Sequence, residues 1–197
     1  MFENYTGEDV QLDTRFYLPG HSVFICVQGG LNESIAKAIY RTKSVGAGLK
    51  CVPYDQTVGF PEGMREETVR VDNDYGSGSY NITFYRAAEI DLKIGVYVNS
   101  SEYSGIEEID SLVKDAVIKW SLNNVSNIEG LKVGLNISPY EIAAAVSDQI
   151  PELRIRRVTV TNISGGGATE GGEYKILPYQ VGKIERGNIT LYTGDDI

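Results

Sequence analysis

Apolar and polar residues alternate along three stretches of the chain, and this period of two predicts half-buried β-strands. The longest stretch runs from Ile90 to Val98, with every second residue apolar. Two shorter ones, Glu67–Val71 and Tyr80–Tyr85, are separated by a glycine-containing loop, which predicts a β-hairpin. The mostly apolar run His21–Gln28 and the segment Arg154–Asn162 predict two further strands.

Three segments have the apolar spacing of amphipathic helices. The first runs from Asn32, the expected cap, to about Arg41, and glycines 46 and 48 stop it. The second opens on the capping-box pattern Ser104-Gly105-Ile106-Glu107, and the third on Ser138-Pro139-Tyr140-Glu141, which ends near Ile150. The apolar face predicted for the second helix consists of Ile106, Ile109, Leu112, Val113, Ala116 and Trp120, with Trp120 as a core anchor.

The remaining segments are polar or rich in glycine and proline. Residues 1–20 and 49–66 are expected to be irregular, and residues 165–172 to form a glycine-rich loop. Two short final strands are predicted at Tyr174–Leu177 and Asn188–Thr193. Between Leu153 and Val160 the apolar residues change face at Arg156 and Arg157, which predicts a β-bulge or a strand edge there.

These elements predict an α+β protein made of two small mixed units, with helices packed on mainly antiparallel sheets. The first unit covers residues 1–87 in the order β-α-β-β, and the second covers residues 88–197 in the order β-α-α-β-β-β. Composition agrees, because 37 Ile and Val residues against 12 Leu favour strands over helical bundles.

Charge and aromatic content narrow the classes of partner. The chain has 18 Lys and Arg against 27 Asp and Glu, a net charge of −9, which argues against a nucleic-acid partner. The 13 tyrosines outnumber the 5 phenylalanines. Tyrosine has an apolar ring and a polar tip, so this excess suits surfaces that contact other proteins.

The cysteines and the N-terminus predict a cytoplasmic protein. Cys26 lies in an apolar strand and is expected to act as a small core residue, while Cys51 lies in a loop. We expect both thiols to stay reduced rather than to form a Cys26–Cys51 bridge. The acidic start of the chain lacks the pattern of a signal peptide, and no apolar run is long enough to span a membrane.

The number of Asn-x-Ser/Thr triplets favours a secreted protein over a cytoplasmic one. Chance predicts about one or two Asn-x-Ser/Thr triplets, whereas 8 of the 11 asparagines begin one. A secreted, glycosylated protein would explain the excess, and the alternative is that Asn, Ser and Thr share turns and strand ends. The triplets begin at Asn4, Asn32, Asn81, Asn99, Asn124, Asn136, Asn162 and Asn188.

The residue types that carry catalysis occur singly. His21 is the only histidine and follows a Pro-Gly turn, so a structural role is expected for it. Cys26 as a nucleophile would need an electropositive, partly open site, and its neighbours are apolar. Asp72 and Asp74 resemble the start of a calcium loop, but Thr83 stands where the bidentate acid would fall, so a hairpin turn is the better interpretation.

The basic and glycine-rich segments give no stronger signal. Arg154, Arg156 and Arg157 form the only basic cluster, for which a solvated or edge-protecting role is favoured over phosphate binding. The glycine clusters at 76–78 and 165–167 precede no helix that could bind a phosphate. We therefore predict no catalytic, cofactor-binding or metal site, and no enzyme; a hydrolase using Asp72, Asp74 or Cys26 is the disfavoured alternative.

Short motifs follow one another in a defined order over about residues 5–193. A strand ending in Gly29-Gly30 is followed by Ile35-Ala36-Lys37-Ala38-Ile39 and by Gly46-Ala47-Gly48. The series continues with Thr83-Phe84-Tyr85-Arg86, Ile137-Ser138-Pro139-Tyr140, Ile150-Pro151-Glu152-Leu153, Ile176-Leu177-Pro178-Tyr179 and Gly187-Asn188-Ile189-Thr190-Leu191. This ordered series resembles the baseplate J-like family of contractile phage tails, in which a Phe-x-Arg segment similar to residues 83–86 precedes a long alternating strand.

The resemblance covers the C-terminal portion of that family, whose members carry a further N-terminal region. It implies a structural wedge subunit of a phage tail baseplate or related injection machine, without cofactor. The implied partners are other baseplate proteins and copies of the chain itself, and the implied location is the virion tail, assembled in the bacterial cytoplasm. The alternative from the residues alone is a secreted or surface-exposed module that binds a glycan or a receptor.

Overall fold

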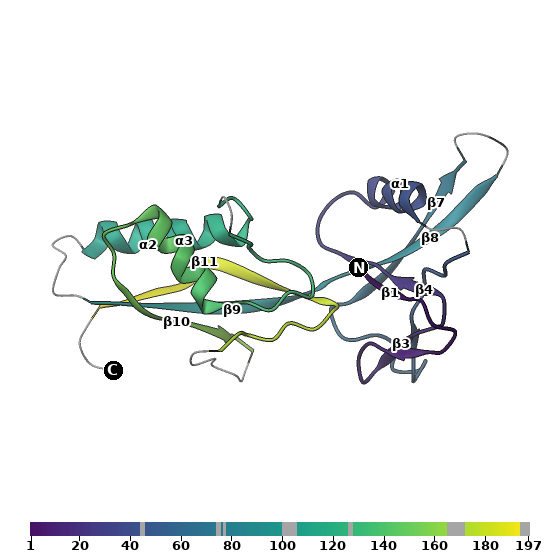
Figure 1. Cartoon of the computed structure of the whole chain (residues 1–197), viewed down its shortest axis with the longest axis horizontal. Coiled ribbons are helices and arrows are strands. Elements are labelled where there is room, and N and C mark those ends of the chain that lie inside the picture. Colours follow the sequence, from purple (N-terminus) through teal and green to yellow (C-terminus); the bar gives the residue numbers. More distant parts are fainter. Residues whose placement is uncertain are drawn as a thin grey trace. The chain divides into compact units, whose positions relative to one another are not determined.

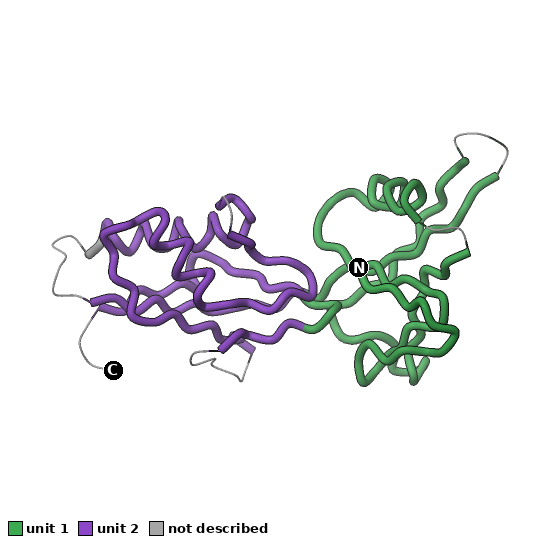
Figure 2. Tube along the Cα trace, in the orientation of Figure 1, with its two compact units in different colours: residues 1–88, 177–180 green, residues 89–176, 181–197 purple. Residues whose placement is uncertain are grey.

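The structure is a computed structural model that describes residues 1–43, 46–73, 76, 78–99, 106–125, 128–164 and 172–193. Among these residues it has three helices and eleven strands in four mostly antiparallel sheets (Figure 1). The predicted α+β class, with helices packed on sheets, is confirmed. The contacts divide the chain into two compact units, residues 1–88 with 177–180, and residues 89–176 with 181–197 (Figure 2). Relative to the predicted division, Ala88 and residues 177–180 lie in the first unit.

The first unit is built on a three-stranded sheet in the order β5-β8-β7. Strands β7 (Arg65–Asp72) and β8 (Ser79–Arg86) form the predicted antiparallel hairpin, and β5 (Cys26–Val27) pairs parallel to β8. Helix α1 (Asn32–Thr42) covers one face, where Ala36 and Ile39 pack on apolar residues of the hairpin. The helix prediction is confirmed, but Leu31 rather than Asn32 is its cap residue.

The prediction that residues 1–20 are irregular was wrong. They contain β1 (Phe2–Asn4), β2 (Val10–Gln11) and β3 (Phe16–Leu18), and the predicted strand His21–Gln28 is divided into β4 (Ser22–Phe24) and β5. Strand β1 pairs with β4, and β3 lies between β2 and the two-residue β6 (Val52–Pro53). These strands are too short to show a period of two in the sequence, so tertiary pairing decides their conformation.

The other face of the β5-β8-β7 sheet packs on an aromatic cluster. The Tyr85 ring lies 5.2 Å from Phe24 and 5.3 Å from Phe60, centroid to centroid. The Phe16 ring lies 5.8 Å from Phe24 and 5.6 Å from Tyr179. Tilted and edge-to-face pairs at these distances add to the free energy of burying the rings.

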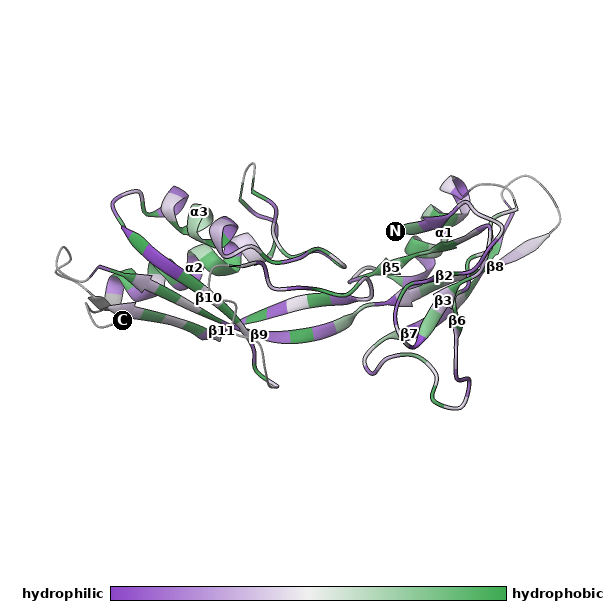
Figure 3. Cartoon of the chain, turned by 60° about the horizontal axis from the view of Figure 1, so that its bottom comes forward, coloured by the Kyte–Doolittle hydropathy of each residue, from purple (hydrophilic) through white to green (hydrophobic). Residues whose placement is uncertain are grey.

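The second unit is a three-stranded sheet in the order β10-β9-β11 with two helices on one face (Figure 1). Strand β9 (Ala88–Val98) pairs antiparallel with β10 (Ile155–Asn162), and β11 (Gln180–Thr193) lies on its other side. Figure 3 shows the alternation of apolar and polar residues along β9. Its apolar residues Leu92, Ile94, Val96 and Val98 are buried against the helices, as the sequence predicts.

Helices α2 (Ile106–Ser121) and α3 (Pro139–Gln149) cover this core. Trp120 is buried, and its Nε1 donates a hydrogen bond to the carbonyl oxygen of Glu129 at 2.7 Å, so the core-anchor prediction is confirmed. Leu112 was wrongly placed on the apolar face, since it is 47% exposed. Ser138 is the cap residue of α3 but makes no side-chain cap bond, and the capping box expected for α2 begins at Ser104, outside the described residues.

The end of the chain differs most from expectation in this unit. The predicted strand Asn188–Thr193 is confirmed as the end of a longer strand, β11. The strand predicted at Tyr174–Leu177 was wrong, since Tyr174 forms only an isolated bridge with Ile137. The unit therefore has the order β-α-α-β-β among the described residues. The bulge predicted near Arg156 is confirmed, because the β10–β9 register shifts between Ile155 and Arg157. No described helix is both long and apolar enough to cross a membrane.

Candidate functional site

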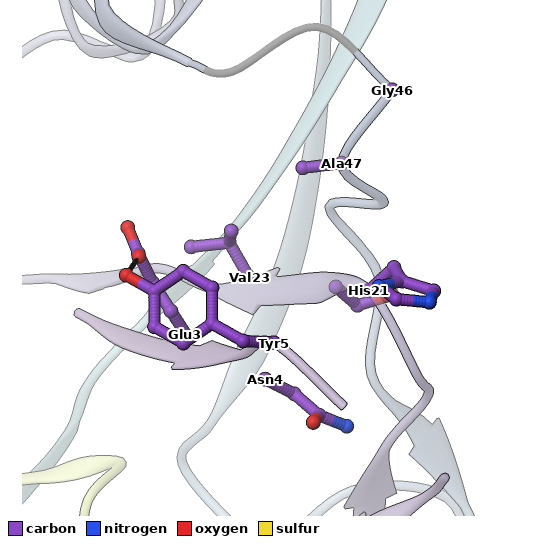
Figure 4. A pocket seen from close by; sticks show the side chains of 8 residues that line it. Glu3, Asn4, Tyr5, His21, Val23, Gly46 and Ala47 are labelled. Atoms are coloured by element: carbon purple, nitrogen blue, oxygen red, sulfur yellow. Dashed lines mark hydrogen bonds between the residues drawn. The ribbon is translucent and has the colours of Figure 1, made fainter. Parts of the chain in front are cut away.

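A pocket of about 370 Å³ lies in the first unit, beside the paired strands β1 and β4 (Figure 4). Tyr5 stands at its rim and donates a hydrogen bond to the carboxylate of Glu3. The remaining lining residues are Asn4, His21, Ser22, Val23, Gly46 and Ala47. The lining therefore includes an exposed phenol, a carboxylate and an imidazole beside the apolar side chains of Val23 and Ala47.

Asn4 is the most constrained residue of this pocket. It is 4% exposed, and its Nδ2 donates to the carbonyl oxygens of Glu8, Leu18 and Pro19 at 2.8–3.1 Å. Its Oδ1 accepts hydrogen bonds from the N–H and the hydroxyl of Thr6 at 3.0 and 2.7 Å. All its hydrogen-bonding groups thus serve the fold, so Asn4 shapes the wall of the pocket and is not offered to a ligand or to glycosylation.

The bond from Asn4 to Thr6 gives a physical reason for part of the Asn-x-Ser/Thr excess. Asn162 does the same in the second unit, where its Oδ1 accepts a hydrogen bond from the N–H of Ser164 at 2.8 Å. These are Asx-turns, in which the asparagine side chain stands in for a backbone carbonyl two residues before the donor. Two of the eight triplets therefore have a structural role in turns.

His21 serves the turn through its backbone. It is exposed and has a φ of 55°, which is unusual for a residue other than glycine. Its N–H donates to the carbonyl of Thr6, and its carbonyl accepts from the N–H of Gly48, both at 3.0 Å. These two bonds hold the strained turn, and the preceding Gly20 packs so closely on Gly7 that a Cβ would approach its carbonyl to 2.6 Å.

Both cysteines are free and buried. The core position predicted for Cys26 is confirmed, whereas the burial of Cys51 was not predicted. Burial raises the pKa of Cys26 to about 12 and that of Cys51 to about 11. The Sγ of Cys26 lies 3.9 Å from the carbonyl oxygen of Tyr179. At neutral pH both sulfurs hold their protons, and the thiol form is a poor nucleophile.

The acidic candidates of the hairpin loop are only partly described. Asp72 ends β7 with a side chain that is 87% exposed, and it lies 3.9 Å from the Nε of Arg70. Asp74 lies outside the described residues. Within the part of the chain that the structure describes, no three His, Cys, Asp or Glu side chains are grouped to hold a metal ion.

Arg157 belongs to an aromatic cluster on the β10-β9-β11 sheet that was not predicted from the sequence. Its guanidinium lies over the ring of Tyr97 at 4.3 Å, and Tyr97 stacks on Tyr192 with centroids 4.5 Å apart and planes at 10°. Arg157, Tyr97 and Tyr192, which we call the tyrosine ladder, belong to β10, β9 and β11 and so cross the whole sheet. A Cβ at Gly95 would come within 3.2 Å of both tyrosine rings, so glycine leaves room for the stack.

The alternation in β9 contains the signal that could have revealed this ladder. Gly95 and Tyr97 occupy the positions between the core residues Ile94, Val96 and Val98, so they belong to the face away from the helices. Arginine over an aromatic ring is a favourable cation–π contact. The favoured edge or surface role for the arginine cluster is in line with this position of Arg157, though the contact to Tyr97 was not foreseen.

Comparisons with known proteins add no family to this geometry: no family model matches the chain, and no curated protein matches its sequence.

Proposed function

We propose that this chain is a structural subunit of a contractile phage tail baseplate or related injection machine, and that it acts through protein–protein contacts. The observation that carries a contact function is the placement of its tyrosines. Five of them are exposed in the described part of the chain. Aromatic side chains are enriched at the centres of protein–protein interfaces, where the partner buries them. They are Tyr5, Tyr54, Tyr80, Tyr140 and Tyr192.

The choice of a baseplate among contact proteins rests on the ordered motifs, two of which meet in the fold. Arg86, from the Phe-x-Arg segment, donates hydrogen bonds to the carbonyls of Gly29 and Gly30 and to Asn32 Oδ1. Strand β5, which ends two residues before Gly29-Gly30, is also paired with β8, which ends in Arg86. Motifs far apart in sequence thus form one structural unit, which supports treating them as a set.

The test is the presence of the chain in assembled tails. We expect a tagged full-length chain, expressed with the tail proteins of the same source, to co-purify with tail particles, and its deletion to abolish tail assembly. Replacing the exposed Tyr54 and Tyr140 together by serine should reduce incorporation, while the exposed Lys132→Ala serves as a surface control. Normal tails without the chain would overturn the proposal.

The mass of the native chain provides an independent readout in the same experiment. An unmodified mass in tail fractions supports the baseplate proposal. Glycans on Asn81 or Asn124, which are both exposed, would contradict it and favour a secreted or surface-exposed binding module.

A further inference from the structure

The outer edge of strand β7 carries backbone groups that no described strand pairs. In the sheet order β5-β8-β7, β7 is the last strand. The N–H of Tyr85 on β8 donates to Ile25 of the β5 side at 2.9 Å, so the backbone groups of Tyr85 point away from β7. Tyr85 lies opposite Glu66, and therefore Glu66, Thr68 and Arg70 direct their N–H and C=O groups toward the open edge.

A groove follows this edge. It measures about 310 Å³ and lies between Glu33 and Lys37 of α1 and residues Val69–Asp72 of β7. Figure 1 shows the β7–β8 hairpin extending past α1, so the edge beyond the helix is reachable by another strand. An open strand edge beside a helix is the arrangement in which proteins add an extended segment to a sheet.

The charged side chains along the edge of β7 are complementary to the same side chains of a second copy of the chain. Glu66, Thr68 and Arg70 share the face of β7 opposite α1, because Val69 and Val71 pack toward the helix. If a second β7 strand lies antiparallel with Thr68 opposite Thr68, each Glu66 lies opposite an Arg70 of the second copy. Opposite charges directly across an antiparallel pair are favourable, and like charges are unfavourable.

Neighbouring registers lack this match. A shift of the centre by one residue toward Val69 places Glu66 opposite Asp72, and a centre at Glu66 or Arg70 places like charges opposite each other. The register centred on Thr68 also pairs residues whose backbone groups both point outward, as a hydrogen-bonded pair requires.

We propose that a second copy of this chain pairs with the β7 edge, through an antiparallel two-fold contact centred on Thr68. This inference rests on the proposed function in one respect: a baseplate subunit is expected to contact other copies of itself. It adds the surface through which two copies would pair. It can fail while the chain is still a baseplate protein, because the test uses the purified chain alone. A contact of one strand per copy is small, so the dimer should be weak and concentration-dependent.

A charge-swap experiment tests the register with the full-length chain. In sedimentation velocity over a concentration series, the wild type should shift from monomer toward dimer. Arg70→Glu alone and Glu66→Lys alone should each stay monomeric, since each places like charges across the dyad. Glu66 also accepts a hydrogen bond from Tyr85 Oη and lies 3.4 Å from Lys50 Nζ within its own copy, so thermal unfolding must first show that Glu66→Lys is folded. A mixture of the two variants should recover the dimer, because each Glu66 then faces Arg70 and each introduced glutamate faces the introduced lysine. Lys132→Glu is the matched control and should dimerise as the wild type does.

Cross-linking gives a second readout that does not depend on charge. Directly opposed Cα atoms of a hydrogen-bonded pair lie about 5.5 Å apart, which suits a disulfide. Thr68→Cys should therefore form a covalent dimer under mild oxidation, whereas Thr83→Cys, on the adjacent strand β8, should not. The buried Cys26 and Cys51 leave the wild type as the background. Circular dichroism checks that each variant is folded.

Two results would overturn the proposal. One is a wild type that remains monomeric across the whole concentration series. The other is a dimer that persists in Arg70→Glu and fails to cross-link through Thr68→Cys, which would place self-association on another surface. Strand addition by a foreign peptide would appear as a monomeric wild type.

Discussion

The backbone N–H of Cys51 donates a hydrogen bond to Tyr85 Oη at 3.0 Å, in the interior of the first unit. The same hydroxyl lies 3.2 Å from Glu66 Oε2, to which it donates. Tyr85 therefore connects the loop that contains Cys51 to both strands of the hairpin. Burial and the contact with Cys51 raise the pKa of this phenol well above its ordinary range, so it remains a donor at all physiological pH values.

Tyr85→Phe should reduce the free energy of unfolding by about 1–2 kcal/mol, because a buried N–H loses its acceptor while the ring stays in place. Urea unfolding with an unchanged slope would measure the loss. Tyr80→Phe is the control: Tyr80 is 51% exposed and its ring packs on Tyr40 without need of the hydroxyl, so no measurable change is expected. Equal effects from both substitutions would contradict the role given to the Tyr85 hydroxyl.

The two buried thiols predict a loss of stability in alkaline solution. Burial raises the pKa values of Cys26 and Cys51 from 9.0 to about 12 and about 11. Above pH 9 the folded chain then binds more protons than the unfolded chain, so the free energy of unfolding is full below pH 9 and falls as the pH rises toward 11–12.

The urea midpoint measured from pH 8 to pH 10.5 checks this expectation. The variant with both Cys26→Ala and Cys51→Ala should be less stable throughout, because it loses packing, but its midpoint should fall less steeply with pH. The slope is the relevant readout. Parallel curves for the wild type and the double variant would show that the thiols do not set the pH dependence.

Arg86 predicts a graded effect on the first unit. Its guanidinium donates to Gly30 O at 2.8 Å, as well as to Gly29 O and Asn32 Oδ1. Arg86→Ala should cost about 2–3 kcal/mol of unfolding free energy, since charge-assisted hydrogen bonds are stronger than neutral ones. Arg86→Lys keeps the charge but loses the planar guanidinium. Its free energy of unfolding should therefore lie between those of the wild type and Arg86→Ala. A lysine variant as stable as the wild type would show that charge alone is needed.

Gly130 predicts a steric effect in the second unit. A Cβ at this position would lie 2.0 Å from the carbonyl oxygen of Trp120, so the backbone would have to move. Gly130→Ala should therefore cost about 2 kcal/mol or more. Gly187→Ala, where a Cβ would meet nothing within 4 Å, should change stability by less than about 0.5 kcal/mol. Thermal unfolding of the two variants checks this: the midpoint should fall for Gly130→Ala and stay near the wild-type value for Gly187→Ala. Equal midpoints would contradict the steric argument.

The sequence predicted those elements whose periodicity is long enough to be read. Strand β9 shows four buried apolar residues at alternate positions, and α1 and α3 begin and end close to where their helix signals predict. Only the end of β11, Asn188–Thr193, was predicted, because Gly182, Lys183, Glu185 and Arg186 interrupt the alternation in its first half, although the strand begins at Gln180. Leu112 fits the helical spacing and is nevertheless exposed, since spacing does not say how wide the covered face is.

The candidate surfaces depended on contacts between distant segments, which a single sequence does not reveal. The tyrosine ladder needs Tyr97 and Tyr192 on adjacent strands, and their pairing follows from the sheet order and not from local pattern. Asn4 looked like a glycosylation site, and only the three carbonyls around its amide assign it to the turn. For His21 the local sequence was sufficient, because the Pro-Gly turn already indicated a structural position.

Tyr179 is buried in the first unit, although it follows nearly all of the second unit in the chain. Its ring packs on Phe16, and its carbonyl accepts a hydrogen bond from the N–H of Ala88 at 2.8 Å. A nascent chain leaving the ribosome therefore exposes Phe16 without this partner until residue 179 has been translated. We therefore expect the first unit to begin folding first and to be completed only after most of the second unit has been translated, in contrast to the usual N-to-C order of domains.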